Sequence, residues 1–310
     1  MKRVIITGAT GAIGRALIEE LIENQIEVLV FCREGSPRNK GILESPLVSV
    51  KYYRLDCLAD IQNDTGKQYD VFYHFAWDGT IGKIRNDMYL QAMNVKYSLD
   101  AVNIAKRFGC HTFVGAGSQA EYGRVEGKLS PDTPAFPETG YGIAKLCAGQ
   151  MTREMARQLD IKHVWVRILS VYGPHDAQNT MVMTTIDQIK KGIKPQFTKG
   201  EQMWDYLYSR DAAKAFRLIG EKGIDGRTYV LGSGIARPLS YYIKEIRDAI
   251  NKKAELDFGA IPYSEKQVMY LCADINELTK DTGFQPRTDF HHGIRMTLER
   301  YSDEKNFIAY

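Results

Sequence analysis

The 310-residue sequence lacks several features that mark specialised classes of protein. Its five cysteines are scattered and include no C-x-x-C pair, which argues against a disulfide framework or a metal site and predicts free thiols in a reducing compartment. Lys and Arg exceed Asp and Glu by only 41 − 38 = 3, so the basic excess typical of nucleic-acid-binding proteins is missing. The apolar runs are too short for a membrane span or a signal peptide. These absences predict a cytoplasmic protein with no metal and with no nucleic-acid or membrane partner.

The sequence does have a regular alternation of short apolar runs and helical patterns up to about residue 174. We predict strands at residues 4–6, 27–31, 48–55, 70–76, 111–116 and 163–169. Strands that alternate with helices are typical of an α/β fold with a doubly wound parallel sheet, the Rossmann architecture. From about residue 175 the alternation becomes irregular. We therefore predict an NAD(P)-binding Rossmann domain at residues 1–174, to which some later segments return, and a smaller C-terminal lobe at residues 175–310 that mainly binds substrate.

The first predicted strand runs directly into a glycine-rich segment, which is followed by a helical pattern. Glycines at such a turn allow a tight bend and a close approach of the backbone, and the new helix presents its N-terminus to a pyrophosphate. The spacing is G-x-x-G-x-x-G, and the alternative is a glycine-rich turn without a ligand. In the context of strand, loop and helix, we predict dinucleotide contacts. They would come from Gly8, Thr10, Gly11, Ala12, Ile13 and Gly14.

The end of the second predicted strand bears on the choice of nicotinamide cofactor. An acidic residue there would bind the adenosine ribose hydroxyls of NAD. The sequence instead has Arg33, followed by Ser36 and Arg38, and a guanidinium suits the 2′-phosphate of NADP. We therefore favour NADP(H). NAD(H) is the alternative, in which Arg33 is solvated and Glu34 contacts the ribose.

Three residues between Ser118 and Lys145 together suit proton transfer. Tyr141 and Lys145 are four residues apart, so on a helix they lie on one face. An ammonium group one turn away favours the phenolate and lowers the tyrosine pKa from its usual value of about 10. Ser118 follows the fifth predicted strand, whose carboxyl end opens on the same crevice as the glycine loop. Its hydroxyl can hold a carbonyl oxygen against the phenol, so the trio predicts acid–base work at a carbinol oxygen.

Together these segments resemble the extended short-chain dehydrogenase/reductase superfamily, and within it the nucleotide-sugar epimerase, dehydratase and reductase group. The resemblance is carried by Thr7, Gly8, Gly11, Gly14, Asp56, Phe75, Ala76, Asn94, Ser118, Tyr122, Gly123, Tyr141, Lys145, Arg167, Tyr172, Gly173 and Pro174. It covers most of the chain. It implies a nucleotide-diphosphate sugar as substrate and hydride transfer between nicotinamide C4 and a sugar carbon, commonly C4. It also implies that a homodimer can form through the helices at residues 86–108 and 141–159.

The resemblance further implies roles for individual residues. Ser118 would hold the substrate oxygen, Tyr141 would be the acid/base, and Lys145 would lower the tyrosine pKa and bind the nicotinamide ribose. The other cofactor contacts would be Asp56 and Cys57 at the adenine, and Ala76, Asn94 and Leu169 toward the nicotinamide. The other substrate contacts would be Gln119, Ser170 and Trp204.

Two departures from the family pattern bear on the activity. The family's Arg-Asp-Tyr-(Val/Ile)-His run, whose arginine contacts the substrate diphosphate, is Trp-Asp-Tyr-Leu-Tyr at residues 204–208. Arg210, Lys199 and Arg237 are the candidates to replace that arginine. This run and residues 117–123 instead resemble 4-ketoreductases of the CDP-abequose synthase kind. The second departure is the missing acidic residue after the second strand, since an exchangeable NADP(H) fits a net reduction better than a tightly held NAD.

The leading hypothesis is therefore an NAD(P)H-dependent reductase of a nucleotide-diphosphate 4-keto-sugar. A 4-epimerase would use the same residues for its first half-reaction and is the alternative. A dehydratase is less well supported, because its usual Asp-Glu pair is replaced by Gln119 and Ala120. An alternative of another class is a non-catalytic dinucleotide sensor on the same fold, although such proteins tend to lose the tyrosine–lysine pair.

Overall fold

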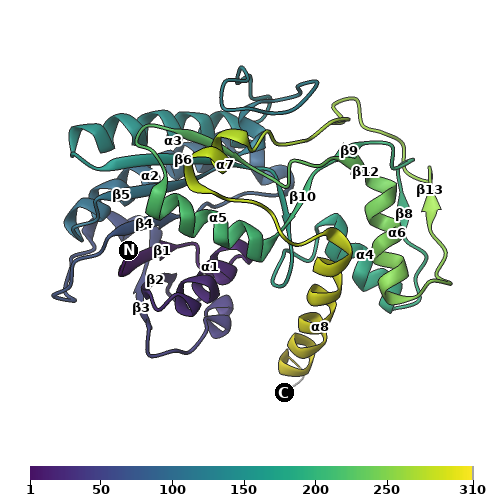
Figure 1. The fold of residues 1–310 in the computed structure, drawn as a ribbon, viewed down its shortest axis with the longest axis horizontal. Helices are drawn as coiled ribbons and strands as arrows, with labels where there is room; N and C mark the ends of the chain where they lie inside the picture. The colour runs from purple at the N-terminus through teal and green to yellow at the C-terminus, as the bar shows by residue number, and fades with distance from the viewer. Residues whose placement is uncertain (309–310) are drawn as a thin grey trace.

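The computed structural model describes residues 1–308, apart from the side chains of Leu55, Asp56 and residues 301–308. Its centre is a sheet of seven parallel strands in the order β11-β6-β5-β4-β1-β2-β3 (Figure 1). These strands are β1 (Arg3–Thr7), β2 (Glu27–Arg33), β3 (Val48–Tyr53), β4 (Val71–His74), β5 (Thr112–Ser118), β6 (Lys162–Ile168) and β11 (Thr228–Leu231). The order reverses between β1 and β4, and ligands of open α/β sheets bind at the carboxyl ends of the strands at such a reversal. The predicted Rossmann sheet is confirmed.

Two pairs of helices cover the two faces of the sheet (Figure 1). Helices α1 (Ala12–Glu23) and α5 (Ser209–Lys222) pack together over one face, and α2 (Met88–Arg107) and α3 (Gly140–Gln158) over the other. Successive residues of a strand point to opposite faces. Val4 and Ile6 accordingly join the core beneath α1 and α5, whereas Ile5 joins the core beneath α2. A strand buried on both faces explains why the first apolar run shows no polar alternation.

Several boundaries differ from those predicted by the sequence. Strand β2 continues two residues further, to Arg33. The predicted third strand ends at Tyr53 and gives way to the short helix η2 (Leu55–Asp60). The helix expected at residues 86–108 is divided into a short turn, η3 (Gly82–Asn86), and α2. Helix α2 begins after Asp87 because the Asp87 side chain accepts a hydrogen bond from the Leu90 backbone and caps the helix.

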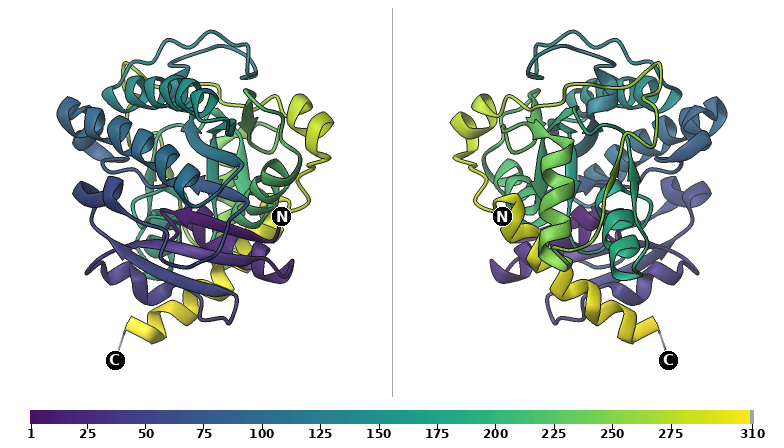
Figure 2. Two further views of the ribbon diagram at one scale, coloured as in Figure 1. Left: turned by 90° about the vertical axis from the view of Figure 1, so that its left-hand side faces the viewer. Right: turned by 90° about the vertical axis from the view of Figure 1, so that its right-hand side faces the viewer.

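Most of the remaining elements come from the C-terminal half and lie beside one end of the sheet, whereas α7 (Asn276–Thr282) packs against α5 and β11. Helix α8 (Phe290–Ile308) runs along the bottom of the molecule in both side views (Figures 1 and 2). The remaining elements comprise η1 (Pro37–Gly41), η4 (Gln119–Glu121), β7 (Ser170–Tyr172), α4 (Met181–Lys190), β8 (Gln196–Phe197), β9 (Met203–Trp204), β10 (Tyr206–Tyr208), β12 (Arg237–Pro238), α6 (Leu239–Ile250), β13 (Asp257–Phe258), α7 and α8, of which η1 and η4 come from earlier in the chain. Helices α4, α6 and α8 enclose an aromatic cluster in which the Phe290 ring lies 4.6 Å from both Tyr172 and Tyr242. Strand β11 instead pairs with β6, so one late segment does return to the main sheet. Within the described residues, no helix is long and apolar enough to cross a membrane.

Candidate active site

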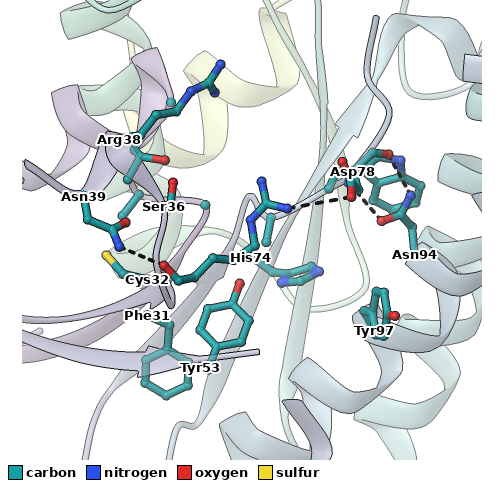
Figure 3. A pocket seen from close by; sticks show the side chains of 17 residues that line it. Phe31, Cys32, Ser36, Arg38, Asn39, Tyr53, His74, Asp78, Asn94 and Tyr97 are labelled. Carbon is teal, nitrogen blue, oxygen red and sulfur yellow. Dashed lines mark hydrogen bonds and ion pairs between the residues drawn. The ribbon is translucent and has the colours of Figure 1, made fainter. Parts of the chain in front are cut away.

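A pocket opens at the carboxyl ends of β1, β2 and β4, where the strand order reverses (Figure 3). Its walls come from the glycine loop, the end of β2 with the turn that follows, and the loop after β4. Six of the predicted cofactor residues line it, namely Gly8, Thr10, Gly11, Arg33, Ala76 and Asn94. Ser36 and Arg38 line it as well. The structure thus brings together residues that are up to 86 positions apart in the chain.

The glycine loop fits a dinucleotide pyrophosphate. Gly8 has a positive φ of 71°, and a Cβ there would lie 2.5 Å from the backbone nitrogen of Ala76, so only glycine fits. A Cβ on Gly14 would lie 2.7 Å from the Gly8 carbonyl oxygen, so this glycine allows α1 to pack closely on the loop. A Cβ on Gly11 would meet only one atom, 3.7 Å away, which leaves open space above the loop. No side chain caps the N-terminus of α1, so its first N–H groups are available to an anion.

Arg33 lines the pocket at the end of β2. Its guanidinium forms an ion pair of 3.7 Å with Asp78, in the loop after β4. Asn94 of α2 holds that loop, because its amide donates to the Asp78 carbonyl oxygen at 2.8 Å and accepts from the Asp78 N–H at 3.0 Å. Asn39 donates to the Arg33 carbonyl oxygen at 2.7 Å and so ties η1, which contains Arg38, to the end of β2. Two guanidinium groups therefore line one pocket.

The other predicted cofactor residues lie outside this lining. Ala12 and Ile13 form the first turn of α1, behind the loop. Cys57 is an exposed thiol on η2. Leu169 is buried between β6 and β7, where its N–H donates to the Leu231 carbonyl oxygen. The side chain of Asp56 lies outside the part of the chain that the structure describes.

The serine and tyrosine of the predicted trio meet at the edge of the sheet. Ser118 is the last residue of β5, and Tyr141 lies in the first turn of α3, which Thr139 caps by accepting from the Gly142 N–H. The Ser118 hydroxyl is close enough to the Tyr141 phenol to lower the phenol pKa. The Ser118 oxygen also accepts the Ala120 N–H at 3.2 Å. Two members of the predicted trio therefore lie next to each other at the carboxyl end of β5.

Lys145 has different partners from those predicted by the sequence. Its ammonium donates to the Ala116 carbonyl oxygen at 2.6 Å and lies 3.8 Å from the centre of the Trp77 ring. It is 5.8 Å from the centre of the Tyr141 ring. Burial lowers the pKa of Lys145 to about 7, although the Glu121 carboxylate partly opposes this shift. The hydrogen bond of the lysine ammonium thus goes to the backbone of β5.

The acidity of Tyr141 reflects several opposing influences. Burial raises its pKa, and the negative charge of Glu121 acts in the same direction. The hydrogen bond with Ser118 and the positive charge of Arg85 lower the pKa. The sequence predicted that Lys145 would be the cation that lowers it. Arg85 is a second cation at this tyrosine, with its guanidinium carbon 4.6 Å from the centre of the Tyr141 ring.

Glu121 is a fully buried carboxylate that the sequence reasoning missed. It accepts the Ser118 N–H at 2.8 Å, the Trp165 indole N–H at 3.0 Å and the Arg167 Nε–H at 2.8 Å. Arg167 is itself only 8% exposed, and its guanidinium lies 4.5 Å from the centre of the Tyr122 ring. This network fixes the serine at the end of β5. A signal was present in the sequence, because Ser-x-x-Glu at residues 118–121 is a capping box.

The predicted substrate residues occupy the neighbouring region, on the side of the C-terminal elements. The Trp204 indole donates to the Ser170 hydroxyl at 2.8 Å, which joins β9 to β7. Gln119 is half-buried and opens η4 directly after Ser118. Trp77, whose ring contacts both Lys145 and Tyr141, was also missed by the sequence reasoning. Within the described part of the chain, no group of three His, Cys, Asp or Glu side chains could hold a metal ion.

Comparison with known proteins agrees with this site. A model of the NAD dependent epimerase/dehydratase family matches residues 4–232. The chain is 25% identical to dTDP-4-dehydro-6-deoxyglucose reductase of Escherichia coli over 306 residues, which is 96% of each chain. It is also 25% identical to CDP-abequose synthase of Salmonella typhimurium over 305 residues, covering 96% of this chain and 97% of the relative. The solved structure of UDP-N-acetylglucosamine 4-epimerase from Methanobrevibacter ruminantium, 20% identical, matches 98% of this chain and 99% of its own with a TM-score of 0.87, which shows a shared fold.

The family match covers most of the chain and includes the glycine loop, Ser118, Tyr141 and Lys145. The resemblance drawn from these residues is thereby confirmed. The protein is an enzyme of the short-chain dehydrogenase/reductase type, and the chain belongs to the NAD dependent epimerase/dehydratase family.

Proposed function

We propose that the protein reduces the 4-keto group of a nucleotide-diphosphate sugar with NADPH. The observation that carries the proposal is that Ser118, at the carboxyl end of β5, lies close to Tyr141, at the start of α3, beside a pocket lined by two guanidinium groups. Two relatives at 25% identity, the dehydro-deoxyglucose reductase and the abequose synthase, support a reduction. The substrate would reach the site from the side of Ser170 and Trp204, and we propose residues 175–310 as mainly the substrate-binding lobe.

In this mechanism, Ser118 and Tyr141 handle the carbonyl oxygen of the substrate. Ser118 donates a hydrogen bond to that oxygen through its hydroxyl group. Tyr141 gives its proton to the same oxygen while the carbonyl carbon accepts hydride. A bound NADPH would supply the hydride, and residues 8–14 would hold its pyrophosphate. Lys145 would bind the nicotinamide ribose.

The preference for NADPH depends on the end of β2. A 2′-phosphate needs cationic donors, and Arg33, Ser36 and Arg38 surround the adenosine side of the pocket. Glu34, the residue that would bind the ribose hydroxyls of NAD, is exposed and does not line the pocket. The other proposed cofactor contacts are Asp56, Cys57 and Leu169, in addition to residues 8–14, Ala76 and Asn94.

We propose Arg237 as the group that replaces the family's diphosphate-binding arginine. Strand β12 pairs with β9, and in this pairing Arg237 lies directly opposite Trp204. Trp204 occupies the position at which the family has its arginine. Arg210 instead forms an ion pair with Glu23 of α1. Lys199 is exposed and lies close to Gly259. Only Arg237 combines exposure with a place beside the substrate residues.

We also propose that the protein is cytoplasmic and forms a homodimer. The outer faces of α2 and α3, which pack against each other, expose several large apolar side chains. They include Tyr89 at 89%, Ile143 at 52% and Met151 at 45% exposure. Such a patch on a chain of this size marks an interaction surface.

The test is reduction of a panel of nucleotide-diphosphate 4-keto-6-deoxyhexoses, followed by the loss of NADPH absorbance. We expect oxidation of NADPH with at least one sugar and far slower oxidation by Tyr141→Phe, which should still bind the nucleotide. If no sugar is reduced even at high enzyme concentration, the reductase proposal fails. Interconversion of UDP-sugars without added nucleotide would favour the 4-epimerase. An unchanged Tyr141→Phe variant would favour a sensor.

A further inference from the structure

Arg85 lies beside the catalytic phenol without a role in the mechanism above. It belongs to η3, the turn between β4 and α2, and its guanidinium carbon is 4.6 Å from the centre of the Tyr141 ring. Its Nε atom is buried and has no hydrogen-bond partner. Within the described residues, no carboxylate forms an ion pair with it. The charge of Arg85 is therefore not neutralised by any carboxylate among the described residues.

The fold holds η3 against the helix that contains Tyr141. The Asn86 side chain accepts the Gly140 N–H at 2.9 Å, directly before Tyr141. On the other side of the turn, Gln91 of α2 donates to the Ile84 carbonyl oxygen at 3.4 Å and to the Gly79 carbonyl oxygen at 3.0 Å. The turn is therefore fastened at both ends. The approach of the guanidinium to the phenol follows from this attachment and not from the freedom of a long side chain.

Three other groups near Tyr141 bear on its ionisation, namely Lys145, Glu121 and Ser118. Lys145 is 5.8 Å from the ring centre, and the Ala116 carbonyl oxygen and Trp77 already engage its ammonium. Glu121 contributes a negative charge that opposes ionisation of the phenol. Ser118 contributes a neutral hydrogen bond. Of these two cations, Arg85 lies nearer to the centre of the Tyr141 ring and has no described carboxylate as a partner.

We propose that Arg85 is a positioning residue that stabilises the phenolate form of Tyr141, the role that the sequence assigned to Lys145. In the reduction, the O–H bond of Tyr141 breaks, its proton goes to the substrate oxygen, and the carbonyl carbon takes the hydride from NADPH. The negative charge left on the phenol then lies against the guanidinium of Arg85. The inference rests on the proposed function for the direction of proton transfer, but the ionisation of Tyr141 can be measured without a substrate.

The experiment is a titration of Tyr141 in protein labelled with 3-fluorotyrosine, whose phenol is more acidic than that of tyrosine. Fluorine NMR follows each residue, and the Tyr141 signal is assigned from its absence in Tyr141→Phe. We expect Arg85→Met to raise the pKa of the residue at position 141 by about one unit, as removal of a cation at this distance should. Arg85→Lys should restore most of the shift. Lys83→Met, which removes an exposed cation from the same turn, is the control and should leave the titration unchanged.

A second readout is the pH dependence of kcat/KM with NADPH and an accepted 4-keto-sugar. We expect the ionisation assigned to Tyr141 to move upward in Arg85→Met by the same amount, with KM little changed. If Arg85→Met and Lys83→Met titrate like the parent protein, the inference about Arg85 is wrong, whatever the substrate. If the fluorine titration shifts but no sugar is reduced, the inference stands and the reductase proposal fails. If Arg85→Met does not fold, Arg85→Gln takes its place in the same comparison.

Discussion

Removal of the charge on Glu121 should be among the most destabilising single substitutions in the catalytic region. Its carboxylate is fully buried and accepts hydrogen bonds from Ser118, Trp165 and Arg167. Arg167 is only 8% exposed, so without Glu121 it becomes a buried cation with no counter-charge. Breaking a buried ion pair from one side costs about 3–5 kcal/mol. Set against a typical unfolding free energy of about 5–15 kcal/mol, Glu121→Gln should remove a large share of the stability.

The assay is urea unfolding at 25 °C, followed by circular dichroism, for four variants in parallel. Glu121→Gln and Arg167→Met each remove one charge of the pair. The double variant Glu121→Gln/Arg167→Met removes both, and since no buried charge is then left alone, it should be less destabilised than the sum of the two single changes. The control is Glu138→Gln, which breaks the half-exposed pair between Arg124 and Glu138, 2.8 Å apart. That substitution should cost less than about 1 kcal/mol.

Two results would refute this reasoning. If Glu121→Gln shifts the urea midpoint no more than Glu138→Gln does, the buried pair is not a strong determinant of stability. If the double variant is as unstable as the two single losses added together, the two side chains are not coupled. Activity gives an independent check, because the Ser118 N–H bond to Glu121 holds the serine at the end of β5. A folded Glu121→Gln variant should therefore lose kcat before it loses cofactor binding.

The remaining predictions concern a buried lysine, the cofactor and the assembly. Because the pKa of Lys145 is about 7 in the folded chain and about 10.5 when unfolded, the unfolded chain binds more protons between these values. Stability should therefore rise with pH across that window, and Lys145→Met should flatten the rise in melting temperature measured from pH 7 to 10. Arg33→Met should weaken binding of 2′,5′-ADP but not of 5′-ADP in calorimetry, whereas Asp78→Asn, which frees Arg33 from a half-exposed pair worth less than about 1 kcal/mol, should strengthen it up to about fivefold. Equal affinities for the two nucleotides in the parent protein would refute the preference for NADP(H). Ile143→Glu with Met151→Glu should convert the proposed dimer to a monomer in light scattering, and a parent protein that is already monomeric would contradict the interface.

The sequence predicted the first half of the fold well because its signals are local. An apolar run followed by a glycine loop and a helical pattern specifies β1, its turn and α1 without reference to the rest of the chain. The C-terminal elements gave weaker signals. Strands β8, β9, β12 and β13 have two residues each, and their pairings join segments about 35 to 60 positions apart. A two-residue strand has no periodicity to detect, so its existence depends on tertiary packing.

The candidate site divides in the same way. The glycine loop and the spacing of Tyr141 and Lys145 are local patterns, and Ser118 could be placed by the rule that active residues follow strand ends. The side chains that contact these residues could not be predicted from local patterns. The ion pair between Asp78 and Arg33 joins the ends of β4 and β2, two strands that β1 separates in the sheet. Neither segment contains a sequence pattern that predicts this contact. Cys57 was assigned to the adenine from its place after the third strand, yet the structure leaves it exposed and outside the pocket lining.

The acidity of Tyr141 shows that a sequence motif does not by itself determine the pKa values of its residues. The Tyr-x-x-x-Lys spacing fixes both side chains on one face of α3, but it does not decide where the ammonium goes. Lys145 donates to β5 and packs on Trp77, and burial lowers its own pKa to about 7, so near neutrality its positive charge is only partial. A guanidinium, by contrast, is protonated throughout this pH range in proteins. We therefore expect a phenolate at Tyr141 to be balanced by a constant cation from η3 and by a lysine of its own helix whose charge depends on pH.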